Sequence, residues 1–176
     1  MRKRTVALFI LAAIAAIWLL FVPRPAAEGE RAAPPPLEGF AHAPGRDFFG
    51  YYFAEPPVRI GDLRLHHLHI GSPREFGLFE GGGERLATYA PLMLQFDDET
   101  SARGVNELGQ TWYEVSHRVL PSAYRVFPDD VRFAGTHDAL GPVGFTGRFG
   151  QGSLAGTLTV GGETFAGLTF RHHAGD

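Results

Sequence analysis

Residues 153–170 read SLAGTLTVGGETFAGLTF, and this stretch decides the fold class. Polar and apolar residues alternate on both sides of Gly161-Gly162, which predicts two strands, Ser153–Val160 and Glu163–Phe170. Both glycines can take positive φ, so the sequence predicts a two-residue hairpin turn. We also expect a β-bulge near Ala166–Gly167, because a bulge returns Leu168 and Phe170 to the face of Phe165.

Further period-two patterns, interrupted by Gly, Pro and Asp-Asp pairs, begin at Phe48. The polar stretch Asp97–Gly109 has no such alternation and predicts a long loop between two of the strands. Ten short strands in succession predict an all-β domain, built as a single antiparallel β-sandwich or a meander barrel. The eight other predicted strands are Phe48–Phe53, Val58–Ile70, Phe76–Glu80, Leu86–Phe96, Trp112–Leu120, Ala123–Phe127, Val131–Gly135 and Val143–Phe149.

The N-terminal sequence predicts a membrane anchor. Arg2-Lys3-Arg4 precedes an uninterrupted apolar run, Val6–Val22, which is long for a signal peptide and sufficient to cross lipid. The positive flank predicts a cytoplasmic N-terminus. We therefore expect a single-pass transmembrane signal-anchor at 1–23, a Pro-rich extracytoplasmic linker at 24–46, the all-β domain at 47–173 and a tail at 174–176. A cleaved signal peptide is the alternative, and it would export the domain as well.

Composition narrows the function. Lys3 is the only lysine, and the other 15 basic residues are Arg. This bias is typical of a GC-rich bacterial genome. We therefore expect a bacterial inner-membrane protein with a periplasmic or otherwise extracytoplasmic domain. Without Cys or a Lys in the domain, thiolate, Schiff-base and P-loop chemistry are excluded. Residues 47–176 hold 16 acidic and 10 basic residues, a net charge of about −6, which disfavours nucleic-acid binding.

Histidine is the unusual residue, with seven of the eight lying beyond Gly45. Strict alternation places His67 and His69 on one face of their strand, together with Leu65, and a His-x-His pair can offer two imidazoles to one metal ion. His117, on another predicted strand, is the candidate third ligand. A metal-binding protein or metalloenzyme holding zinc or copper is therefore one hypothesis. The alternative, which we favour, is exposed or hydrogen-bonded histidines and no cofactor.

Aromatic residues suggest a binding surface. Both faces of the predicted strand Phe48–Phe53 are aromatic, so one face should meet something other than its own core. The candidate partner-binding residues are Phe49, Tyr51, Tyr52 and Trp112. We therefore expect first a non-enzymatic accessory or protein-interaction subunit with a protein partner in or near the membrane.

A second possibility for function is a lipocalin-like barrel that binds an apolar ligand in its interior. That function needs a cavity, and the sequence offers five apolar residues to line it: Leu92, Leu94, Phe96, Phe133 and Phe145.

Overall fold

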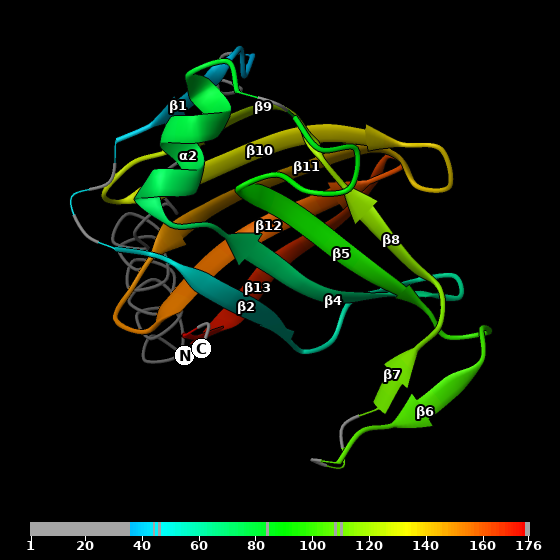
Figure 1. Ribbon diagram of the computed structural model, residues 1–176. Helices are drawn as coiled ribbons and strands as arrows, with labels where there is room; N and C mark the ends of the chain where they lie inside the picture. Colours follow the sequence, from blue (N-terminus) through cyan, green and yellow to red (C-terminus); the bar gives the residue numbers. More distant parts are fainter. Residues whose placement is uncertain are drawn as a thin grey trace, which may run out of the picture. The chain divides into compact units, whose positions relative to one another are not determined.

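The chain is mostly β in the computed structural model, and its main sheet curls into a half-barrel (Figure 1). The structure describes residues 36–43, 45, 47–83, 85–107, 109 and 111–174. The predicted anchor at 1–23 and the first part of the predicted linker lie outside these residues. In the described part of the chain, no helix is long and apolar enough to cross a membrane.

Thirteen strands and one helix make up the described fold. The strands are β1 (Phe40–His42), β2 (Gly50–Glu55), β3 (Arg59–Ile60), β4 (Leu63–Ile70), β5 (Leu92–Asp98), β6 (Arg103–Val105), β7 (Thr111–Tyr113), β8 (Ser116–Val119), β9 (Pro121–Val126), β10 (Asp130–His137), β11 (Gly141–Phe149), β12 (Ser153–Val160) and β13 (Glu163–His173). The helix is α2 (Pro73–Glu80). Strand β1 lies in the stretch assigned to the linker, so the folded unit begins before residue 47.

The pairing order of the main sheet is β1-β9-β10-β11-β12-β13-β2-β4-β5-β8, with β3 beside β4. Strands β9 to β13 form an antiparallel meander, as the sequence predicts, and only the short β1 joins in parallel. Strand β13 then pairs with β2, more than a hundred residues earlier in the chain. Leu120 alone separates β8 from β9, which are near opposite ends of the pairing order, so the sheet must curl to bring them together.

The final hairpin confirms the prediction from residues 153–170. Val160 pairs with Glu163, and Gly161 and Gly162 have φ values of 57° and 93°. The pairing register shifts between Gly156 and Leu158, and Gly167 has φ 69°. This irregularity is the expected bulge, and Leu168 and Phe170 are both buried in the core as a result.

The predicted strand Phe76–Glu80 is wrong, because these residues form the second half of helix α2. Ser72 caps the helix: its hydroxyl accepts a hydrogen bond from the Glu75 amide, and the Glu75 carboxylate accepts one from the Ser72 amide. Pro73 follows at the first helical position, where its missing N–H costs nothing. The local Ser-Pro-Arg-Glu motif is a helix-start signal that outweighs the short period-two pattern after it.

Four other predictions need correction. The stretch Asp97–Gly109 is not one loop, since it contains the end of β5 and the whole of β6, which pairs with β7 in a separate two-stranded sheet. Turns divide the predicted strands Val58–Ile70 and Trp112–Leu120 into β3–β4 and β7–β8, and β5 begins only at Leu92.

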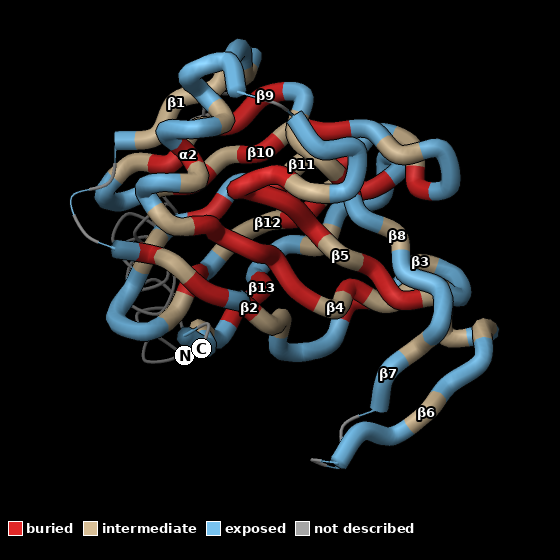
Figure 2. Tube along the Cα trace, viewed as in Figure 1, coloured by how far each residue is buried: buried red, intermediate tan, exposed pale blue. Residues whose placement is uncertain are grey.

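The core occupies the concave side of the sheet, and buried segments follow the centre of the main strands (Figure 2). Across β2, β4, β5 and β8, the row Tyr52, Leu68, Leu94 and Val119 points into this core. Alternate residues on the same strands must therefore point to the outer face of the sheet. Helix α2 adds Phe76, which packs against Tyr124 of β9 and stacks on His42 of β1.

Candidate functional site

A β-bulge places two histidines on the outer face of β4. The register between β4 and β5 shifts between Leu65 and His67, so Leu65 joins the core while His67 and His69 face outward. The prediction that the two histidines share a face is confirmed, but Leu65 does not lie with them. Both histidines are nevertheless covered, with only 6% of His67 and 4% of His69 exposed.

His69 belongs to a chain of hydrogen bonds that ends at the start of helix α2. Its Nε2 lies 3.1 Å from the hydroxyl of Tyr89, and that hydroxyl donates to the Glu75 carboxylate. The other carboxylate oxygen of Glu75 accepts from the amide and the hydroxyl of Ser72, at 2.6 and 2.7 Å. The helix cap therefore orients Glu75, which in turn orients Tyr89.

Protonation along this chain follows from the environment. Burial would raise the pKa of Glu75, but hydrogen bonds from Tyr89 and Ser72 lower it below its ordinary value, so Glu75 is ionised. Burial and the adjacent Glu75 raise the pKa of Tyr89, which keeps its proton and donates it to the carboxylate. The Tyr89 oxygen must then accept from His69, so Nε2 of His69 carries the proton and Nδ1 has a bare lone pair.

His67 is neutral as well. Burial, together with the neighbouring His66 and His69, lowers the pKa of His67 to about 3. Its Nδ1 lies 2.6 Å from Nδ1 of His66, and the ring of Tyr51 lies edge-to-face beside it. Nε2 of His67 and Nδ1 of His69 are both buried and have no hydrogen-bond partner among the described residues. Each such orphaned polar atom costs about 1–3 kcal/mol.

The structure does not bring His117 to this pair. His117 lies opposite Phe96, a core residue, so it is on the other face of the sheet, and its ring packs against His137. Among the described residues, no three His, Cys, Asp or Glu side chains are grouped closely enough to hold a metal ion. Sequence reasoning also missed Tyr89 and Glu75, whose roles depend on contacts across 20 and 14 residues of chain.

The aromatic candidates after the linker separate by face. Tyr52 is buried in the core and its hydroxyl donates to the Phe48 carbonyl at 2.9 Å, so it cannot contact a partner from the surface. Tyr51 and Phe49 lie on the outer face, where their rings pack against His69. The histidine pair therefore explains much of the outer aromatic face that the sequence left unpartnered.

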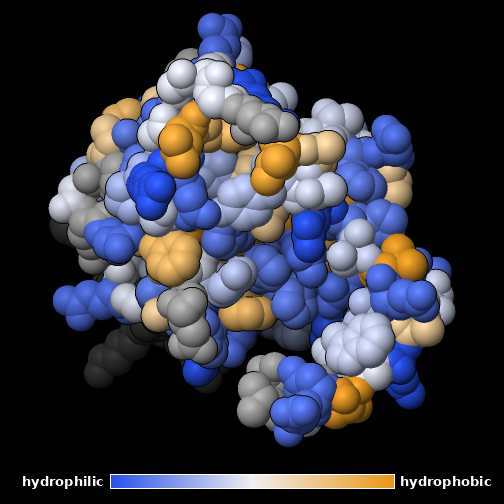
Figure 3. All heavy atoms as spheres, in the orientation of Figure 1, coloured by the Kyte–Doolittle hydropathy of each residue, from blue (hydrophilic) through white to orange (hydrophobic). Residues whose placement is uncertain are grey.

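Trp112 is in a different position. It lies on the β6–β7 hairpin, which stands away from the main sheet (Figure 1), and 52% of it is exposed. A Cβ on the opposite residue, Gly104, would lie 2.6 Å from the indole ring, so the indole packs flat on the bare glycine backbone. Val105 on the same hairpin is also exposed, and Figure 3 shows hydrophobic atoms there at the lower right.

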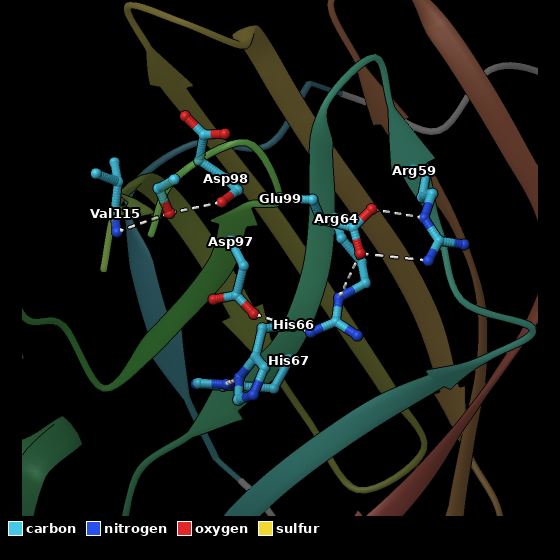
Figure 4. A network of polar contacts seen from close by, with 9 residues as sticks. Arg59, Arg64, His66, His67, Asp97, Asp98, Glu99 and Val115 are labelled. Carbon is cyan, nitrogen blue, oxygen red and sulfur yellow. Dashed lines mark hydrogen bonds and ion pairs between the residues drawn. The ribbon is translucent and has the colours of Figure 1, made fainter. Parts of the chain in front are cut away.

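Ion pairs and hydrogen bonds hold the base of this hairpin (Figure 4). Arg64 of β4 pairs with Asp97 at 3.1 Å and with Glu99 at 3.5 Å, and its guanidinium lies over the Tyr113 ring of β7. The backbone amide of Asp98 donates to the Val115 carbonyl at 3.0 Å. These contacts fix the direction in which the hairpin leaves the sheet.

A groove runs between the hairpin and the main sheet. Its volume is about 640 Å³, and residues of β2, β4 and the hairpin line it, among them Phe53, His66 and Trp112. The interior of the half-barrel differs: the five residues proposed to line a ligand cavity, Leu92, Leu94, Phe96, Phe133 and Phe145, are at most 2% exposed and pack in one cluster.

Comparison of the chain with protein-family models gave no match, and comparisons with curated proteins and with solved structures gave none either.

Proposed function

We propose that the protein is a membrane-tethered, non-enzymatic accessory subunit that binds an extracytoplasmic protein partner through the β6–β7 hairpin and the adjoining groove. The apolar run 6–22 and the prolines of the linker support an architecture of a transmembrane helix, a stiff spacer and a barrel-like domain. In this proposal, the barrel is the scaffold that presents the hairpin.

The observation that carries the proposal is the half-exposed Trp112. Tryptophan is the side chain that most often dominates the energy of a protein interface. One face of this indole already packs on Gly104, so the side chain would lose little conformational entropy when it binds a partner. Its other face is available beside a groove large enough to accept side chains of a partner.

The surroundings suit a protein contact. Exposed apolar residues, Val105 and Val115, lie on and next to the hairpin, while Arg64, Asp97 and Glu99 form a polar border at its base. An apolar centre with a polar rim is the usual anatomy of a protein interface. The residues proposed to line a ligand cavity belong to the buried core cluster, so they offer less support to a carrier of apolar ligands, which needs an enclosed cavity.

The proposal is tested on the full chain, tagged at its C-terminus and extracted from its native membranes in mild detergent. The wild-type chain should run as a complex larger than its own mass, with a stoichiometric partner. Trp112→Ala should release it as a lone species, because loss of a tryptophan anchor costs about 2 kcal/mol or more. Leu86→Ala, at a residue 54% exposed on another part of the domain, is the matched control and should leave the complex intact.

A chain that runs alone in the wild type, or a complex that survives Trp112→Ala, would contradict the proposal. Circular dichroism of both variants should match the wild type, because neither side chain belongs to the core.

A further inference from the structure

Three residues that can bind a soft metal ion share the covered outer face of the sheet. His69 of β4 lies directly opposite Met93 of β5, in the row that alternates with the core row. Opposed residues of antiparallel strands have Cβ atoms about 4.5–5.5 Å apart. His67 lies two residues before His69 on the same face, so it is the diagonal neighbour of Met93, within reach of long side chains.

Both imidazoles offer a nitrogen with no other role. Nδ1 of His69 and Nε2 of His67 have no hydrogen-bond partner in the described part of the chain, although each residue is more than nine-tenths buried. Polar atoms in such positions are normally paired. A bound ion would satisfy both nitrogens at once.

Met93 is unusual for a buried methionine. It is 6% exposed, yet it does not belong to the hydrophobic core cluster, and it is the only methionine after Met1. Tyr89 bonds to His69, and the backbone of Thr88 accepts a hydrogen bond from Arg118 at 3.2 Å, so the segment before β5 covers this outer face. Met93 is therefore buried on the same face as the two histidines and lies apart from the hydrophobic core cluster.

We propose that His67, His69 and Met93 bind one Cu(I) ion. A thioether is a soft ligand that favours Cu(I) over harder cations, and imidazole binds copper well. All three ligands are neutral. A positive charge lies nearby, because the Arg118 guanidinium donates to the side chain of Gln95, the residue opposite His67. A buried site with neutral ligands and a neighbouring cation favours a monovalent ion, because the desolvation cost of a dication is greater. Structural zinc sites nearly always have four protein ligands, and zinc is bound by Cys, His, Asp or Glu rather than by a thioether, so this three-residue set with methionine suits zinc less well.

Tyr89 and Glu75 act as positioning residues for this site. Their hydrogen bonds keep the proton of His69 on Nε2 and leave Nδ1 for the metal, which is the arrangement that second ligand shells commonly enforce. Tyr51 covers the rings of both histidines on the solvent side. The proposal does not depend on the partner-binding function and can fail or succeed without it.

The experiment is an anaerobic titration of the full chain in detergent with Cu(I), in competition with a chromophoric Cu(I) chelator. The affinity tag must contain no histidine. The wild type should bind one Cu(I), and X-ray absorption should show sulfur and imidazole nitrogen as neighbours of the metal. Met93→Leu keeps the apolar volume and every histidine, and it should weaken binding by more than about tenfold.

Two variants separate the site from general histidine binding. Tyr89→Phe should weaken Cu(I) binding roughly 10–100-fold, because His69 loses the acceptor that holds its tautomer. His117→Gln, on the opposite face, should have no effect. The proposal is overturned if the wild type takes up no Cu(I), if Met93→Leu binds as tightly as the wild type, or if no sulfur neighbour is found.

Discussion

Replacing Phe76 with Ala tests whether residues 73–80 form a helix that packs on the sheet. Phe76 is completely buried, stacks on His42 with ring centroids 3.8 Å apart, and lies 5.3 Å from the Tyr124 ring. Removal of a fully buried phenylalanine ring costs about 3–5 kcal/mol. For a folded unit of this size, the substitution should lower Tm by roughly 10 °C or more.

The control is Leu78→Ala on the same helix. Leu78 comes two residues after Phe76, so on a helix it points to nearly the opposite side, and it is 61% exposed. Its substitution should therefore change stability by about 0.5 kcal/mol or less. In a strand, the two residues would share one face and both substitutions would have similar costs. Urea denaturation followed by circular dichroism measures both. Equal costs, or a cost for Phe76→Ala near 1 kcal/mol, would refute the helical packing.

Three further predictions concern pH and glycine. Burial lowers the pKa of His42 below its ordinary value of 6.5, so the folded state favours the neutral imidazole. The stability that this provides is complete above pH 6.5 and is lost as pH falls below 6.5. His42→Gln should therefore make the free energy of unfolding less dependent on pH between 7.5 and 5. Gly156→Ala should destabilise by about 1–3 kcal/mol, since a Cβ there would lie 2.7 Å from the Phe145 ring, whereas Ala155→Ser at the exposed neighbouring position should be neutral in the same denaturation assay. Gly167→Val should cost about 1–2 kcal/mol because φ is 69° at the bulge, and Gly167→Asn should cost less; equal costs would contradict the assigned backbone conformation.

Local signals made much of the β architecture predictable. Alternation and turn glycines located β9 to β13, and the need to keep Leu168 and Phe170 on the core side located the bulge at Gly167. Helix α2 was also within reach of local reasoning, because Ser72 and Glu75 form a capping box around Pro73. Residues 76–80 were predicted as a strand because Phe76 and Leu78 alternate with other residues over too few positions to distinguish the strand period of two from the helix period of 3.6.

The candidate sites depended on information that no local pattern contains. A bulge at His66 reverses the face of Leu65, and strict alternation gives no warning of it. His117 appeared to be a third ligand because it alternates correctly on its own strand, but the pairing of β8 with β5 places it on the concave side. Met93, the residue opposite His69, was identifiable only from the register of two strands.

By itself, the sequence determined that the fold is mostly β, that the last hairpin carries a bulge, and that His67 and His69 share one face, because each follows from period-two alternation and from turn geometry over a few residues. Tertiary structure alone decided that β13 pairs with β2, that Tyr52 is buried while Tyr51 covers the histidines, and that Tyr89 orients His69. The physical reason is range: alternation assigns a side chain to one of two faces, but only the packing of distant strands and loops determines which face becomes the core and what covers the other.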